Sequence, residues 1–235
     1  MEPKKFADRY LRNQKTISQD EQAKLAKATV VIAGCGGLGG YISEEMARVG
    51  VGHLVLIDGD RIDVTNLNRQ ILAAEDNIGE WKAEAGRERI RRINSGTKVD
   101  AACAWFREED SAQLLAGADL VCDALDSLSA RLALERSCHT LGIPLLYAAI
   151  GGWFGILGLS FPGEYCVARL LKGGDKGIET LWGNPAFTPA VVASLAVAEG
   201  VKVLTGKSPA LRGSWLQIDL LAMEFELFRL SGETL

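Results

Sequence analysis

The sequence has little of what metal centres and acid–base catalysts are commonly built from. Its 235 residues include only two histidines, His53 and His139, and five cysteines, none of them in a CxxC pair. Structural zinc sites use clustered cysteine and histidine ligands, so we expect no structural zinc. An odd number of scattered cysteines also predicts reduced thiols and not a disulfide framework.

Long uninterrupted apolar runs and an excess of charge are also missing. The longest apolar run, PLLYAAIGGWFGILGL at 144–159, is broken by glycines and is typical of strands, not of a membrane span. The first residues, MEPKKFADRYLRNQ, have no apolar segment of the kind found in secretory signals. A net charge of −4 gives no electrostatic reason to expect nucleic acid or an anionic membrane as partner. We therefore expect a cytoplasmic protein.

What is present is a regular alternation of strand and helix patterns. Strand-like runs lie at 29–34, 53–60, 98–105, 119–125 and 143–150, and helical patterns separate them. This alternation predicts an α/β fold, Rossmann-like, with a mostly parallel sheet and helices on both faces. The hydrophobic segments 153–161 and 213–229 also have strand character, and there we expect the sheet to continue with antiparallel strands.

The length and the 48% hydrophobic content predict a single domain over residues 1–235. N-terminal helices should extend to residue 27, the nucleotide-binding half should occupy 28–150, and the antiparallel part 151–235. A glycine-rich segment at about 162–187 has no clear period and predicts a functional loop. After it, Thr188 and Pro189 predict the N-cap and the first position of a helix.

The turn between the first strand and the first helix of the alternation is typical of a phosphate-binding turn. Four glycines occur in the hexapeptide GCGGLG, namely Gly34, Gly36, Gly37 and Gly39. Glycines allow close approach of the backbone to a phosphate, and the helix N-terminus offers free N–H groups. Asp58 follows the second strand 24 positions after Gly34 and is placed to accept hydrogen bonds from ribose hydroxyls. The pattern predicts a nucleotide site but leaves its chemistry open.

One candidate chemistry is hydride transfer by an NAD(P)-dependent oxidoreductase. The four tyrosines lack a lysine four positions later, so the Tyr-xxx-Lys pair is absent. His53 begins a predicted strand and His139 lies inside a predicted helix, positions typical of structural histidines. This hypothesis remains as an alternative, although the sequence offers it little support.

The second candidate chemistry is attack on a nucleotide triphosphate. Arg69, in the polar loop TNLNRQ after the second strand, could reach the phosphates, and Asn66 could bind either the nucleotide or its own loop. Lys82 follows near the start of a helix. An arginine and a lysine that converge on phosphates stabilise developing negative charge.

A carboxylate follows the fourth strand, at the same predicted sheet edge. Asp126, in CDALDS, would repel phosphates unless it held a magnesium ion, for which carboxylate oxygens are common ligands. Its alternative role is N-cap of the helix that begins near Ser127.

Five motifs together resemble the ThiF/MoeB/HesA adenylyltransferases, relatives of ubiquitin-activating enzymes. RYLRNQ, GCGGLG, LIDGDRIDVTNLNRQ, IGEWKAE and DLVCDALDS occur in the order and spacing of that family, over about residues 5–230. The resemblance implies ATP and Mg²⁺ as cofactors and adenylation of the C-terminal glycine of a ubiquitin-like sulfur-carrier protein, with release of pyrophosphate.

The same resemblance assigns roles residue by residue. It gives Gly37 and its neighbours the phosphate contacts, Asp58 the ribose, and Asp126 the magnesium ion. It places Asn66, Arg69 and Lys82 around the triphosphate. It also implies a homodimer in which Arg12, the second arginine of RYLRNQ, reaches the γ-phosphate in the partner subunit.

The sequence departs from the family pattern at its cysteines. Many relatives have two zinc-binding CxxC pairs, and several have a reactive cysteine in the crossover loop, but here that region offers only Cys166. We interpret Cys166 as packed and Cys35 as a space-filling residue of the glycine turn. These departures favour an enzyme that stops at the acyl adenylate, with a separate sulfur donor, and leave open a pseudoenzyme that binds nucleotide or carrier.

Overall fold

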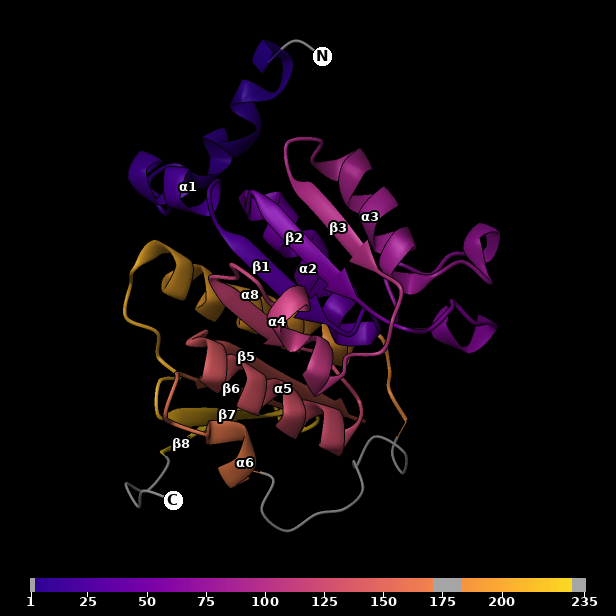
Figure 1. Ribbon diagram of the computed structural model, residues 1–235, viewed down its shortest axis with the longest axis vertical. Helices are drawn as coiled ribbons and strands as arrows, with labels where there is room; N and C mark the ends of the chain where they lie inside the picture. The colour runs from indigo at the N-terminus through magenta and orange to yellow at the C-terminus, as the bar shows by residue number, and fades with distance from the viewer. Residues whose placement is uncertain (1–2, 171–182, 230–235) are drawn as a thin grey trace.

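Eight strands form one sheet in the computed structural model, which describes residues 3–170 and 183–229, with side chains from residue 8 onward. Their spatial order is β3-β2-β1-β4-β5-β6-β7-β8 (Figure 1). Pairing is parallel from β3 through β5 and antiparallel from β5 through β8, which confirms the predicted fold class. The strands are β1 Thr29–Ala33, β2 His53–Ile57, β3 Lys98–Ala102, β4 Leu120–Asp123, β5 Leu145–Gly151, β6 Phe154–Ser160, β7 Ser214–Asp219 and β8 Glu224–Arg229.

Helices cover both faces of the sheet (Figure 1). One face carries α2 Gly37–Val49, α3 Lys82–Ile93 and α8 Phe187–Thr205, and the other carries α4 Ser111–Leu114, α5 Leu128–Leu141 and α6 Cys166–Leu170. The N-terminal part consists of η1 Pro3–Asn13 and α1 Gln19–Leu25, as the sequence predicted, and short 3-10 turns lie at Val64–Asn66, Glu75–Asn77 and Glu108–Asp110.

Alternate residues of the central strands supply the two cores. In β1, Val30 and Ile32 pack on the side of α2 and α8, whereas Val31 and Ala33 pack on the side of α5. All four are fully buried. A strand between two helical layers must be apolar on both sides, and this explains the continuous β-branched run that the sequence shows there.

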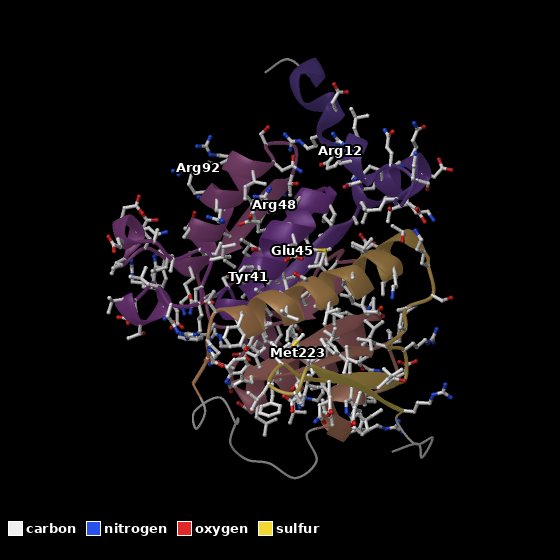
Figure 2. The ribbon with its side chains drawn as sticks, turned by 180° about the vertical axis from the view of Figure 1, so that it is seen from behind. Arg12, Tyr41, Glu45, Arg48, Arg92 and Met223 are labelled. Carbon is white, nitrogen blue, oxygen red and sulfur yellow. The ribbon has the colours of Figure 1, made fainter. Side chains whose placement is uncertain are left out.

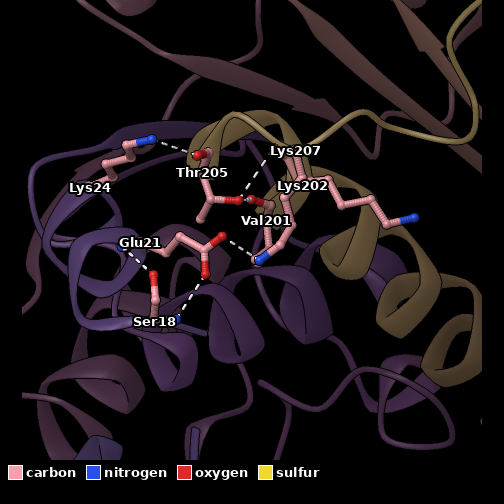
Figure 3. Close-up of polar contacts among 7 residues, drawn as sticks. All are labelled: Ser18, Glu21, Lys24, Val201, Lys202, Thr205 and Lys207. Carbon is pink, nitrogen blue, oxygen red and sulfur yellow. Dashed lines mark hydrogen bonds and ion pairs between the residues drawn. The ribbon is translucent and has the colours of Figure 1, made fainter. Parts of the chain in front are cut away.

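Polar contacts attach the N-terminal helix α1 to the C-terminal end of α8 (Figure 3). Lys24 Nζ donates to the Thr205 carbonyl at 2.8 Å, and Lys207 Nζ lies 2.5 Å from Glu21 Oε1. Glu21 also closes a capping box with Ser18. The hydrogen bond from Lys207 is the main reason that the pKa of Glu21 is lowered to about 2. Segments far apart in the sequence are thereby joined beside the sheet.

Two details of the predicted C-terminal part need correction. The segment 213–229 is not one strand but a hairpin of β7 and β8, because Asp219 Oδ1 accepts the N–H groups of Leu221 and Ala222 and so turns the chain. Helix α8 begins at Phe187, one residue before the predicted N-cap Thr188. The Thr188 hydroxyl donates to the Gly152 carbonyl at 2.6 Å and therefore attaches the helix to the β5–β6 turn.

The glycine-rich segment predicted at 162–187 is only partly within the described residues. Its first part contains the helix α6, and residues 171–182 lie outside the described residues. By length and composition alone, α8 could cross a membrane, yet it packs against α2, β5 and β6 in this fold.

Candidate active site

A cavity of about 260 Å³ opens at the carboxyl ends of the parallel strands. The strand order reverses here, because β1 has β2 on one side and β4 on the other. Ligands of open α/β sheets bind at such a switch point. The cavity is lined by residues 34, 36–38, 57–60, 66, 69, 70, 82, 104–106, 124–126, 150 and 184.

The glycine turn forms the floor of the cavity through Gly34, Gly36 and Gly37. Gly34 has φ +93°, and a Cβ there would lie 2.5 Å from the Ala124 carbonyl oxygen, so only glycine fits. Gly36 is the N-cap of α2. The first N–H groups of α2 therefore face the cavity, as anion binding at a helix N-terminus requires.

Gly39 has a different role from the other three predicted glycines. It does not line the cavity, and a Cβ there would lie 1.8 Å from the Gly34 carbonyl oxygen. Its hydrogen atom lets α2 lie directly on the end of β1. Gly39 therefore allows the close packing of α2 on the end of β1, and it does not line the cavity.

Asp58 connects the glycine turn to the end of β2. Its Oδ2 accepts the Cys35 N–H at 2.6 Å, and its Oδ1 accepts the Asp60 N–H at 2.8 Å. Burial raises the pKa of this carboxyl, and the two backbone donors oppose that rise. The carboxylate lies in the cavity wall with lone pairs that remain able to accept ligand hydroxyls.

The loop TNLNRQ brings an amide and a guanidinium into the cavity. Asn66 Oδ1 accepts the Asp63 N–H at 3.1 Å, so this side chain supports its own loop and also lines the cavity. Arg69 donates to the Thr65 carbonyl at 3.0 Å and to Asn68 Oδ1 at 2.9 Å. These bonds use one guanidinium nitrogen and hold the half-exposed Arg69 along the cavity wall.

Lys82 enters the cavity from the first residue of α3. Its ammonium forms an ion pair with Asp60 Oδ2 at 2.8 Å, and the lysine side chain is 9% exposed. The charge of Lys82 is thus buried with one partner on the cavity wall. An anionic ligand would offer this ammonium a second partner.

Asp126 and Asp123 follow β4 but have opposite environments. Asp126 is exposed at the cavity wall, and no hydrogen bond or ion pair reaches it from residues 8–170 or 183–229. Ser127, not Asp126, is the N-cap of α5, so the alternative role predicted for Asp126 is wrong. Asp123 is fully buried 3.8 Å from Arg131, and burial raises the pKa of its carboxyl to about 6.

The lining residues that were not predicted from the sequence include Asp60, Gln70 and Trp105. Gln70 lies inside the RQ dipeptide and is 5% exposed. Its Oε1 is buried without a hydrogen-bond partner in the described part of the chain. Trp105 ends a strand-like run, a position at which an aromatic ring is more often part of the core.

Arg12 and the cysteines lie outside the cavity lining. Arg12 is exposed on η1, which Figure 2 shows at the end of the molecule that carries the N-terminus. Cys35 is fully buried, and burial raises its pKa well above the ordinary value. Cys166 is buried as well, and burial raises its pKa to about 11. Neither thiol is prepared for nucleophilic attack in this conformation.

The fold and the cavity together define a doubly wound protein with a ligand site at its switch point. A family model described as the ThiF family matches residues 9–234. The chain is 31% identical over 225 residues to the SAMP-activating enzyme E1 of Haloferax volcanii, covering 93% of this chain and 83% of that protein. It is 31% identical over 242 residues to the sulfur carrier protein adenylyltransferase of Thermus thermophilus, covering 94% and 86%.

A solved structure agrees with these sequence comparisons. Escherichia coli MccB with ATP superposes with a TM-score of 0.81 at 25% identity, over 95% of this chain and 71% of that chain. The chain belongs to the ThiF family.

Proposed function

We propose that this chain, an adenylyltransferase of the ThiF family, transfers the adenylyl group of ATP to the C-terminal carboxylate of a ubiquitin-like sulfur-carrier protein. The observation that carries the proposal is one cavity in which a helix N-terminus, Arg69, Lys82 and Asp126 converge beside Asp58. These groups match the parts of MgATP: backbone donors and cations for phosphates, and a carboxylate for the ribose.

The carrier carboxylate attacks the α-phosphorus of ATP, and the bond to pyrophosphate breaks. Arg69 and Lys82 stabilise the charge that develops on the departing phosphates. Because a carboxylate is already ionised near neutral pH, the step needs no general base. The glycine turn lets two backbones and a phosphate approach within contact distance, which favours in-line attack.

The residues present fit a magnesium ion at Asp126. Its carboxylate is exposed beside the glycine turn and is not engaged by the described residues, and a single carboxylate with phosphate oxygens and waters is a common magnesium arrangement. Asp126 would hold the ion there, and the ion would neutralise phosphate charge.

The proposed carrier ends in Gly-Gly, and the proposed product is the acyl adenylate. A separate sulfur donor would convert it to a thiocarboxylate, since Cys35 and Cys166 are buried with raised pKa values. We place the protein in the cytoplasm and treat residues 1–235 as one adenylation domain. Family membership argues against the oxidoreductase alternative.

A homodimer is part of the proposal, with Arg12 reaching the triphosphate in the partner subunit. In its support, α8 carries the exposed Phe187 and the partly exposed Val191 and Leu195, and Figure 2 shows this helix across the back of the molecule beside Tyr41 and Glu45. An apolar helix face of this kind suits burial against a second copy.

The test is ATP–pyrophosphate exchange with a purified carrier that ends in Gly-Gly. We expect exchange that requires the carrier, and a fall of about 100-fold or more in Arg69→Ala. Arg92→Ala, an exposed arginine of α3 outside the cavity lining, is the matched control and should behave as the unaltered protein. Carrier-independent or absent exchange would contradict the proposal.

Mixing two inactive variants tests the proposed dimer. Arg12→Ala and Arg69→Ala each disable every site alone, but a mixed dimer retains one site with both arginines. Random exchange of subunits should restore about a quarter of the activity. No recovery after subunit exchange would show that Arg12 does not act across subunits.

A further inference from the structure

Trp105 presents a large aromatic ring to water at the rim of the cavity. It is 62% exposed although it lines the cavity, and it comes three residues after the end of β3. An exposed tryptophan contributes little to the core, so packing alone does not account for it.

The backbone of Gly59 supports one side of the indole ring. A Cβ at Gly59 would lie 2.7 to 2.8 Å from ring atoms of Trp105, so the absence of a side chain lets the ring lie directly against the main chain. Gly59 immediately follows Asp58, the carboxylate that suits a ribose. The ring is therefore fixed next to the position proposed for the sugar.

The other side chains at this end of the cavity are apolar. Ala104 and Phe106 flank Trp105, and Ala124 and Leu125 line the cavity from the end of β4. The charged groups Arg69 and Lys82 lie on the α2 and α3 side, where the phosphates belong. A nucleotide anchored by its ribose at Asp58 and by its phosphates at the glycine turn must direct its base toward β3 and β4.

We propose that Trp105 is a base-stacking residue, on which a purine ring of the nucleotide lies. This rests on the proposed function, because it assumes that the cavity binds ATP. Stacking uses the open face of the indole and the π-face of the base, and the larger area of a purine favours it over a pyrimidine. Trp105 acts on binding and not on the reacting phosphorus.

The test separates the base end of the site from its phosphate end. Calorimetry with Mg²⁺ measures the affinity for ATP and for inorganic tripolyphosphate, which has no base. In Trp105→Ala we expect ATP affinity to fall about ten-fold or more while tripolyphosphate affinity stays unchanged. Trp105→Phe should recover most of the ATP affinity, and Arg69→Ala should weaken both ligands.

Two further measurements distinguish loss of base stacking from a general structural effect of the Trp105 substitution. Trp153→Ala removes an indole that is 44% exposed but outside the cavity lining, and it should leave both affinities unchanged. ATP should also change the tryptophan fluorescence of the unaltered protein, and this change should be lost in Trp105→Phe.

Each outcome bears on the inference separately from the proposed function. Unchanged ATP affinity in Trp105→Ala, or an equal loss for tripolyphosphate, overturns base stacking. An unaltered protein that binds no ATP overturns the nucleotide site and base stacking together. A ten-fold selective loss of ATP, with no carrier-dependent exchange, supports the stacking role and overturns only the proposed carrier reaction.

Discussion

The parallel half of the sheet and its antiparallel end use apolar residues in opposite ways. In β1, between β2 and β4, every residue after Thr29 is buried, whereas all six residues of β8 are exposed. The first arrangement holds the strand ends rigidly, because helices pack closely on both faces. In the second arrangement, the side chains of β8 form part of the molecular surface. This difference suggests that chemistry belongs to the parallel half and contacts with other molecules to the antiparallel end.

The largest expected difference between the two halves is in how each tolerates a glycine-to-alanine substitution. In Gly39→Ala the new Cβ would lie 1.8 Å from the Gly34 carbonyl oxygen, whereas in Gly158→Ala the nearest atom is 3.8 Å away. We expect Gly39→Ala to lose about 4 kcal/mol or more of the free energy of unfolding and Gly158→Ala to change by about 1 kcal/mol or less.

Urea denaturation of both variants measures this difference. A Gly158→Ala variant that is as unstable as Gly39→Ala would mean that the antiparallel end is packed as tightly as the parallel half. Equal stability of Gly39→Ala and the unaltered protein would mean that the turn between β1 and α2 can move aside.

The sequence predicts the parallel half well for a physical reason. A strand buried on both faces must be a continuous apolar run, and TVVIAG meets that requirement whatever the rest of the fold does. The hairpin at 213–229 was missed because its turn depends on the Asp219 carboxylate and on Met223 at φ +58°, neither of which interrupts the apolar pattern. The start of helix α8 was predicted two residues late, at Pro189 and not at Phe187, because it depends on contacts with the β5–β6 turn.

The second prediction changes a carboxylate to an amide at the end of one strand in each half, Asp126 beyond β4 and Asp219 as the last residue of β7. Asp126→Asn should lower carrier-dependent exchange about 100-fold or more, since the amide cannot balance the charge of a magnesium ion. Its effect on stability should be small, because described residues make no hydrogen bond to Asp126. Asp219→Asn keeps an acceptor for the β7–β8 turn and should leave Mg²⁺-dependent ATP binding unchanged.

Calorimetric titration of ATP with and without Mg²⁺ checks this pair. Magnesium-dependent tightening that persists in Asp126→Asn would remove Asp126 from the metal site. The sequence offered both roles for Asp126, and only the position of the Ser127 cap showed that the aspartate is not needed by α5.

The third prediction concerns pH and the buried Asp123. Burial raises the pKa of its carboxyl from 3.8 to about 6, against the opposing charge of Arg131. An acid with a raised pKa stabilises the fold while it is protonated, and that contribution is lost as pH rises from about 4 through about 6. The loss should approach about 3 kcal/mol, because raising a pKa from 3.8 to about 6 corresponds to roughly that free energy.

Unfolding free energies of the unaltered protein and Asp123→Asn, measured from pH 4 to pH 7 without nucleotide, isolate this effect. The difference between the two proteins should change over that range, in the direction that favours the unaltered protein at low pH. A constant difference would mean that Asp123 is ionised throughout. No comparable buried carboxylate is found in the described strands β7 and β8.

Some candidate site residues could be predicted from the sequence and others could not. Arg69, Lys82 and Asp126 were predicted because cations near a phosphate-binding turn can bind phosphates and a carboxylate there can hold a magnesium ion. Gln70 and Trp105 were not predicted, since a neutral amide can serve its own loop and an aromatic ring can serve the core. Their distinguishing features are an unpaired buried oxygen and an exposed ring, which only three-dimensional structure reveals.

Substitutions in β8 should change the stability of the protein least. Phe225 is 48% exposed and pairs with the fully buried Ile218 of β7. Because much of the Phe225 ring stays in contact with water, Phe225→Ala should lower the free energy of unfolding by about 1 kcal/mol or less at low protein concentration, well below the cost of emptying a core site. Leu227→Ala, at 52% exposure on the same strand, should behave alike. A loss of several kcal/mol that grows with protein concentration would show that β8 is covered by a second copy, and the antiparallel end would then be core in the assembly and surface only in the single chain.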